Sequence, residues 1–265
     1  MTDAIIWLVT LPLAGALATL LLPRSATAVA IGAGLATTVA AGLLLFGVAT
    51  QGTLHYEIGG WSAGLGIALR ADGLSALLLM MTALIALAAS VYASAYFKEP
   101  LERARFWPLW LLLWTALNAL LLSGDLFNLY VTLELLGLSA VSLAALGGKG
   151  TAVAAALRYL LVGLLGSMMF LTGVSLIYAG YGTLDLATLQ RVVEPGPIAW
   201  TALAMMTAGL LLKTALFPLH FWLPPAHASA PAPVSAVLSA LVVKAAFYLV
   251  LRLWLDVFTN VVTQE

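Results

Sequence analysis

Residues 213–235 read KTALFPLHFWLPPAHASAPAPVS, and they lie where one apolar run, 198–217, gives way to another, 234–254. Five of the chain's 11 prolines fall in this stretch: Pro218, Pro224, Pro225, Pro231 and Pro233. Proline removes a backbone donor and disrupts a helix, so we predict a helix break carried by Pro218, Pro224, Pro231 and Pro233. If the flanking runs cross a bilayer, such a break must be buried in protein or face water. Interrupted helices of this kind commonly line ion sites in transporters.

The composition of the whole chain places those apolar runs in a membrane. Of its 265 residues, 63% are hydrophobic and 8% are charged, whereas a soluble domain carries about 25% charged residues. A soluble fold could not cover this much apolar surface. The net charge is zero, which leaves no electrostatic footprint for nucleic acid. The absence of cysteine excludes disulfides, iron–sulfur clusters and thiolate metal sites, and no other metal motif is present.

Apolar runs of about 20 residues, the length that crosses a bilayer, predict an all-α polytopic protein with eight transmembrane helices, the seventh interrupted. The runs are Ala4–Leu22, Ala28–Ala49, Gly73–Ala95, Trp107–Leu122, Leu126–Leu146, Ala152–Ala179, Ile198–Phe217 and Val234–Trp254. Between the second and third runs, the glycine-rich segment 51–72 includes Gly64, and its strands Leu54–Ile58 and Ile67–Arg70 predict a surface β-hairpin. The first run lacks a basic leader, so we expect it to be a retained helix.

Basic residues are distributed unequally between the two sides that alternating spans define. One side receives six: Arg24, Lys98, Arg103, Arg105, Lys149 and Arg158. The other side receives three: Arg70, Arg191 and Arg252. Because cytoplasmic loops are enriched in lysine and arginine, the first side is predicted to be cytoplasmic. Both termini are then predicted on the non-cytoplasmic side of the inner (cytoplasmic) membrane.

Three charged residues, Glu134, Lys213 and Lys244, fall inside the predicted spans. Asp125 suits the N-cap of the fifth helix, and Glu134 follows it by roughly 13–14 Å of helix axis. That is near the middle of a hydrocarbon core about 30 Å thick. A charge at the bilayer centre costs about 2.5–3.5 kcal/mol on insertion scales. All three side chains must therefore face protein or water.

These charges have two interpretations. The first is an ion or proton path in which Glu134 and Lys213 form one tunable pair. The second is a structural ion pair that holds helices together. This second interpretation is less favourable, because the spans contain two lysines but one carboxylate, so one lysine would lack a partner. His220 and His227 follow Lys213 by seven and fourteen residues, one stripe if the helical phase continues. They could relay protons, because histidine titrates near neutrality, or they could lie in a polar loop at the water interface.

Three segments resemble the antiporter-like subunits of proton-pumping respiratory complex I. They resemble even more closely the D subunits of Mrp-type multisubunit cation/proton antiporters and the related subunits of membrane-bound hydrogenases. The segments are SGDLFNLYVTLELLGLS (123–139), YGTLDLATL (181–189) and 213–244 with its PLHFWLP and APAPVS motifs. The 51–72 hairpin and the start of the third span also fit. The resemblance therefore covers essentially the whole chain.

The resemblance implies roles for the three charges. In the family, the matching glutamate and first lysine form a pair whose strength tunes the lysine pKa, and the second lysine passes the proton along a hydrated axis. We carry these roles to Glu134, Lys213 and Lys244. The implied function is proton or cation/proton translocation through a half-channel within a multisubunit complex, with protons or Na⁺ as the ion. We expect no cofactor and no chemistry of the chain's own.

Two other functions remain open at this point. One is a proton-pumping membrane-arm subunit of a complex I-like or hydrogenase redox complex, in which another subunit performs the redox reaction. The other is a non-conducting structural membrane scaffold. Apolar replacements separate these interpretations, because a scaffold tolerates apolar substitutes of similar volume.

The sequence departs from the family pattern in two respects. Where the family often has Leu-Pro-Asp-Ala-His, this chain has Leu223-Pro224-Pro225-Ala226-His227, which removes an acidic group. Family members usually have about fourteen helices in two inverted repeats. This chain supplies three leading helices (1–106), one five-helix repeat (107–256) and a tail (257–265), without the second-repeat lysine. We therefore expect a fragment or a split subunit, or a second half supplied by another chain.

Overall fold

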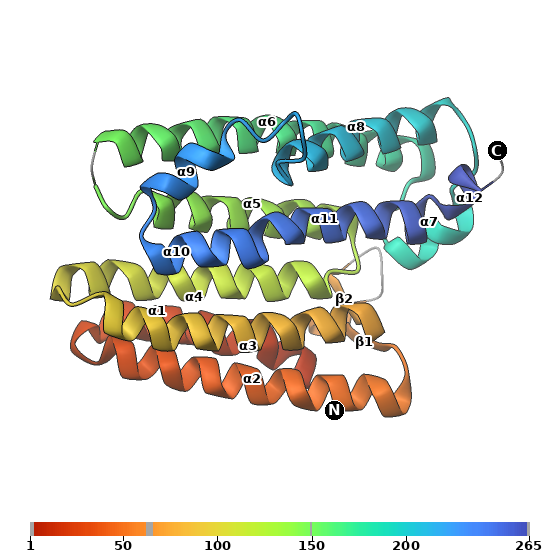
Figure 1. The fold of residues 1–265 in the computed structure, drawn as a ribbon. Helices are drawn as coiled ribbons and strands as arrows, with labels where there is room; N and C mark the ends of the chain where they lie inside the picture. The colour runs from red at the N-terminus through yellow and green to blue at the C-terminus, as the bar shows by residue number, and fades with distance from the viewer. Residues whose placement is uncertain (1–2, 62–65, 149, 264–265) are drawn as a thin grey trace.

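The computed structural model describes residues 3–61, 66–148 and 150–263, which form a bundle of helices that run side by side (Figure 1). Within these residues, seven helices are long and apolar enough to cross a membrane, and an eighth has 17 residues. A two-stranded hairpin connects the second and third helices. The predicted fold class, an all-α polytopic membrane protein with a small hairpin, is confirmed.

The first half of the bundle contains α1 (Asp3–Leu21), α2 (Ala26–Gln51), α3 (Gly73–Tyr96) and α4 (Pro100–Leu122). The second half contains α5 (Leu126–Ala144), α6 (Gly150–Tyr181), α7 (Leu186–Val192), α8 (Pro197–Lys213) and α9 (Leu223–Ser229). The last span, Ala232–Val257, is continuous but irregular, because two π-helical turns interrupt it. Its parts are α10 (Ala232–Val237), a π turn (Leu238–Val242), α11 (Val243–Arg252) and a second π turn (Leu253–Val257), followed by α12 (Thr259–Val262).

The hairpin pairs β1 (Leu54–Glu57) with β2 (Ala68–Ala71) in antiparallel register. The ends of each strand lie within one residue of the predicted run. Gly64, in the glycine-rich segment that we expected to carry the hairpin, lies outside the described residues. The hairpin leads directly into Asp72, the N-cap of α3. Its carboxylate accepts a hydrogen bond from the backbone N–H of Ser75 at 3.0 Å, and the Ser75 hydroxyl accepts one from the Asp72 N–H. This reciprocal capping fixes where the third span begins.

The start of the fourth span and a short helix after the sixth differ from the sequence prediction. Helix α4 begins at Pro100 rather than Trp107, so Arg103 and Arg105 lie in its first two turns instead of a loop. Proline is favoured in the first helical turn because its missing N–H would have no partner there. The short α7 was not predicted, and Asp185 caps it by accepting the N–H of Thr188 at 2.8 Å. Lys149, one of the six basic residues used for the orientation, lies outside the described residues.

The seventh span breaks earlier than the prolines predict. Helix α8 ends at Lys213 rather than Phe217, and residues 214–222 are not helical. Ala215 adopts a φ of 55°, a left-handed conformation that takes the chain out of the helical direction. The helical phase therefore does not continue, and the expectation that His220 and His227 share one stripe with Lys213 is wrong.

Helices α6 and α8 pack with their backbones unusually close. A Cβ atom added to Gly209 would lie 2.2 Å from the carbonyl oxygen of Gly166, and one added to Gly166 would lie 2.7 Å from that of Gly209. The same Cβ on Gly166 would be 3.1 Å from Cγ of Lys213. Small residues allow such approach between membrane helices. The glycine pair thus seats the stem of Lys213 against α6.

An ion cluster ties the hairpin to the end of the last span. The guanidinium of Arg252 donates to Asp72 at 2.5 Å and to Asp256 at 2.8 Å, and Arg70 lies 3.3 Å from Asp72. The Tyr248 hydroxyl accepts a further hydrogen bond from Arg252 at 2.8 Å. Burial raises the pKa of Asp72, but the hydrogen bond from Arg252 and the Ser75 amide outweigh it and lower that pKa to about 2.

Candidate functional site

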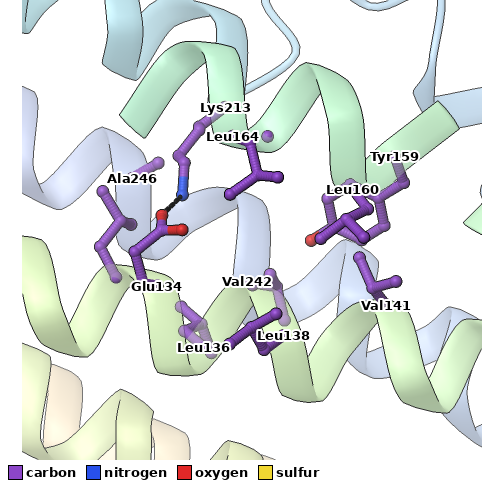
Figure 2. Close-up of a pocket in the computed structure, with 13 residues that line it drawn as sticks. Glu134, Leu136, Leu138, Val141, Tyr159, Leu160, Leu164, Lys213, Val242 and Ala246 are labelled. Atoms are coloured by element: carbon purple, nitrogen blue, oxygen red, sulfur yellow. Dashed lines mark hydrogen bonds and ion pairs between the residues drawn. The ribbon is translucent and has the colours of Figure 1, made fainter. Parts of the chain in front are cut away.

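The structure brings Glu134 and Lys213 together as an ion pair, with 2.8 Å between Nζ and Oε1 (Figure 2). Glu134 lies on α5 and Lys213 is the last residue of α8, so residues 79 positions apart meet between two helices. Their side chains are only 19% and 10% exposed. Asp125 caps α5 by accepting the N–H of Asn128 at 2.8 Å, which confirms the predicted N-cap and sets the depth of Glu134.

A serine on α6 completes the contacts of the glutamate. The hydroxyl of Ser167 donates to Oε1 of Glu134, the same oxygen that accepts from Lys213. Ser167 Oγ also lies 3.1 Å from the carbonyl oxygen of Gly163. Sequence reasoning missed Ser167, although its place beside Gly166 on a small-residue face of α6 is a signal that could have found it.

The early end of α8 places Lys213 at a helix C-terminus inside the bundle. The carbonyls of the last turn need donors beyond the regular helix, and residues that follow α8 supply them to Leu210 and Leu212. Leu210 accepts the N–H of Thr214 at 2.8 Å and its hydroxyl at 2.7 Å, while Leu212 accepts Nε1–H of Trp222 at 3.0 Å. The C-terminal end of a helix carries partial negative charge. The ammonium of Lys213 therefore has two favourable electrostatic partners, the carboxylate and the helix end.

A small cavity adjoins the pair. Its walls come from α5, α6, α8 and the last span, and besides Glu134 and Lys213 they include Tyr159, Gly163, Val242 and Ala246. The volume open to water-sized spheres is about 30 Å³, and one ordered water needs ~10–15 Å³. The cavity, which both charged residues line, therefore has room for about two waters.

Lys244 lies apart from this cavity. It sits near the centre of the Ala232–Val257 span, its side chain is exposed, and its Nζ donates to the carbonyl oxygen of Ser239. Val242 and Ala246 on the same helix line the cavity, but Lys244 does not. The structure thus joins two of the three predicted charges and leaves the third on an outer surface of the bundle.

The histidines and prolines occupy the segment between α8 and the last span. His220 is exposed with its ring centroid 5.7 Å from that of Phe217, and Nδ1 of His227 lies 2.9 Å from Oγ of Ser235. Neither histidine lines the cavity. Of the predicted breaking residues, Pro218 lies in the non-helical stretch, Pro224 is the second residue of α9, Pro231 is the N-cap of α10 and Pro233 is its second residue. A relay role for His220 and His227 stays a prediction.

Comparison with known proteins supplies independent information. The family model for the transmembrane region of NADH:quinone oxidoreductase/Mrp antiporter subunits matches residues 123–264. NADH-quinone oxidoreductase subunit N of Desulforudis audaxviator is 41% identical over 75% of this chain and 40% of its own length. The D subunit of the Na(+)/H(+) antiporter of Bacillus subtilis is 35% identical over 84% of this chain and 46% of its own length.

Solved structures of related membrane complexes match the fold of this chain. A chain of the archaeal membrane-bound sulfane sulfur reductase matches with a TM-score of 0.93 and 30% identity, covering 99% of this chain and 55% of that one. A chain of the Mrp complex from Dietzia sp. matches with a TM-score of 0.88 and 29% identity, covering 98% and 50% respectively. The chain therefore spans about half the length of the relatives that it matches.

Proposed function

The chain belongs to the NADH:quinone oxidoreductase/Mrp antiporter family of membrane subunits, and from that premise we propose that it conducts protons through a half-channel within a multisubunit membrane complex. The observation that carries the proposal is the Glu134–Lys213 ion pair, held at 2.8 Å beside a cavity with room for water. An isolated charge would be expensive at this depth. A paired lysine next to water can be loaded with a proton and unloaded.

The proposed mechanism uses the competition between burial and the carboxylate. A nearby negative charge favours the protonated form of a lysine, and a low-dielectric environment disfavours it. With Glu134 in contact, Lys213 holds its proton. If Glu134 moved away, for example when Ser167 alone bound its carboxylate, Lys213 would release the proton to water in the cavity.

Lys244 fits the proposal as the next acceptor, provided that more protein covers it. A lysine exposed at the middle of a membrane span cannot face lipid without a large cost. We propose that another membrane segment packs over this side of α11 and forms the second half-channel there. Other membrane subunits of an antiporter or respiratory complex are the expected source.

A second version of the proposal differs in the driving force. The similarity to a quinone oxidoreductase subunit favours a proton-pumping membrane arm driven by a redox reaction in another subunit, rather than by exchange for a cation. The two versions predict different dependence on electron donors. Proton transport that continues without any donor and requires Na⁺ or K⁺ supports the antiporter version.

The test replaces each member of the pair in the assembled complex. Lys213→Ala and Glu134→Ala should abolish proton-coupled transport in proteoliposomes while the complex still assembles. Lys98→Ala is the matched control, because Lys98 is an exposed lysine at the end of α3 and should transport normally. Wild-type transport by a correctly assembled Lys213→Ala complex would overturn the proposal.

The orientation and the subdivision of the chain also belong to this proposal. We propose that segment 1–106 packs beside the conducting five-helix unit 107–256, that 257–265 is a tail, and that both termini are non-cytoplasmic. Because the chain has no native cysteine, a single cysteine at Lys98 or at Glu57 can be tested for labelling by an impermeant reagent. We expect labelling of the Glu57 position from outside and of the Lys98 position from the cytoplasm.

A further inference from the structure

A tyrosine hydroxyl opens into the cavity of the ion pair without a protein partner. Tyr159, on α6, is 7% exposed and lines the same cavity as Glu134 and Lys213. Figure 2 shows its oxygen on the side of the ring that faces Glu134. Among the described residues, none forms a hydrogen bond with this hydroxyl. Because Tyr159 lines a cavity with room for water, water there is the natural hydrogen-bond partner of its hydroxyl.

The ring of Tyr159 is held rigidly by the segment that follows α8. It stacks on the indole of Trp222 with 4.4 Å between centroids and 14° between planes. Trp222 is 2% exposed, and its Nε1–H donates to the carbonyl oxygen of Leu212 at 3.0 Å. Leu212 precedes Lys213. Two contacts therefore connect the tyrosine ring to the backbone that carries the lysine, and they fix the direction of the hydroxyl.

The opposite side of the ring faces α9 and the last span. A second space there, too narrow for water, is lined by Tyr159, Trp222, Ala226, Val242 and Val243 among others. The residues that follow Ala226 and Val243 in the chain are His227 and Lys244. Tyr159 thus lines both the cavity of the ion pair and the narrower space beside the segments that carry His227 and Lys244.

We infer that Tyr159 is a proton-relay residue, whose hydroxyl joins the cavity water and passes protons to and from the Glu134–Lys213 pair. In each transfer, the oxygen accepts a proton from one neighbour as its own hydroxyl proton leaves to the next. The phenol is therefore unchanged and no net charge accumulates on it. This inference rests on the proposed function. The competing role is packing alone, for which a phenylalanine would serve equally well.

The test is Tyr159→Phe in the assembled complex, which keeps the stacked ring and removes only the hydroxyl. Positioned proton-transfer groups contribute about 10²–10⁴-fold to rates, and cavity water can substitute in part, so we expect proton flux to fall by at least about tenfold. The matched control is Tyr178→Phe, because Tyr178 lies on the same helix but is 59% exposed on its outer face. The control should transport at the wild-type rate.

A parallel Glu134→Gln variant distinguishes failure of the relay from failure of the proposed function. Normal flux in Tyr159→Phe with no flux in Glu134→Gln would refute the relay and leave the proposed function standing. Normal flux in both would refute both. If Tyr159→Phe assembles poorly, 3,5-difluorotyrosine at position 159 keeps the shape and makes the hydroxyl more acidic. A relay then requires a shifted pH profile of transport, and an unshifted profile overturns it.

Discussion

Replacing Glu134 and Lys213 together with apolar residues of similar size separates a conducting pair from a structural one. Either single change, Glu134→Leu or Lys213→Met, leaves one ion without the partner that lay 2.8 Å away. Breaking a buried ion pair costs about 3–5 kcal/mol, because the remaining charge is uncompensated. The side chains are 19% and 10% exposed, and the remaining group can change its protonation. We therefore expect a cost near the lower end, about 3 kcal/mol, for each single variant.

The double variant should recover most of that loss. No unpaired charge remains, and replacing a buried ion pair by apolar residues is often neutral or stabilising by about 1–4 kcal/mol. The hydroxyl of Ser167, which loses Glu134, still has the carbonyl oxygen of Gly163 at 3.1 Å. No new unsatisfied donor is therefore created. We expect the double variant to be within about 1 kcal/mol of the wild-type free energy of unfolding, since both members of the pair are removed together.

Two measurements on the same preparations decide the question: the unfolding free energy in detergent and proton flux after reconstitution. If the pair conducts, the double variant is stable and assembled but does not transport. If the pair is only a scaffold, the double variant is equally stable and transports normally. Normal transport by the double variant would refute the reasoning, whatever the stabilities of the single variants.

Three further predictions concern the surroundings of the site. Gly209→Ala places a methyl group 2.2 Å from the carbonyl oxygen of Gly166, so thermal unfolding should show a loss of ~1–3 kcal/mol and flux should fall as Lys213 is displaced. The pKa of Asp72 is about 2 in the folded chain, below its ordinary 3.8. The ionised carboxylate therefore stabilises the fold by roughly 2 kcal/mol above pH 3.8, and this contribution is lost as the pH falls towards 2. Acid titration should show this loss in the wild type and not in Asp72→Asn. Lys244→Met should leave the unfolding temperature of the isolated chain unchanged, because the side chain is exposed there, but should abolish flux in the complex.

The transmembrane helices and the ion pair were predictable because the bilayer imposes a local constraint on the sequence. Apolar runs define the spans directly, and a charge within such a run stands out because it needs a partner. Glu134 and Lys213 were identified in this way and do meet. The N-cap at Asp125 followed from a short-range hydrogen bond, which depends only on neighbouring residues.

What escaped prediction depends on packing between segments that are distant in sequence. Ser167 and Tyr159 are neutral residues in an apolar helix, and apart from the small residues around Ser167 nothing local marks them. They matter because α6 places them against Glu134 and the cavity. The break was expected at Pro218, but the helix ends at Lys213, where Thr214 and Trp222 supply donors to the free carbonyls. The Thr214 donor is local, but the Trp222 donor depends on how the following segment folds back, which proline positions do not predict.

The position of the break gives the two lysines different surroundings. Lys213, at the end of α8, has the partial negative charge of a helix terminus in addition to Glu134. Lys244, within a continuous span, contacts only the carbonyl of Ser239 and has no carboxylate partner among the described residues. Two lysines in equivalent surroundings would hold a proton equally well. Because these two differ, we propose that movement of Glu134 alone changes which of them holds the proton and so gives the transfer a direction.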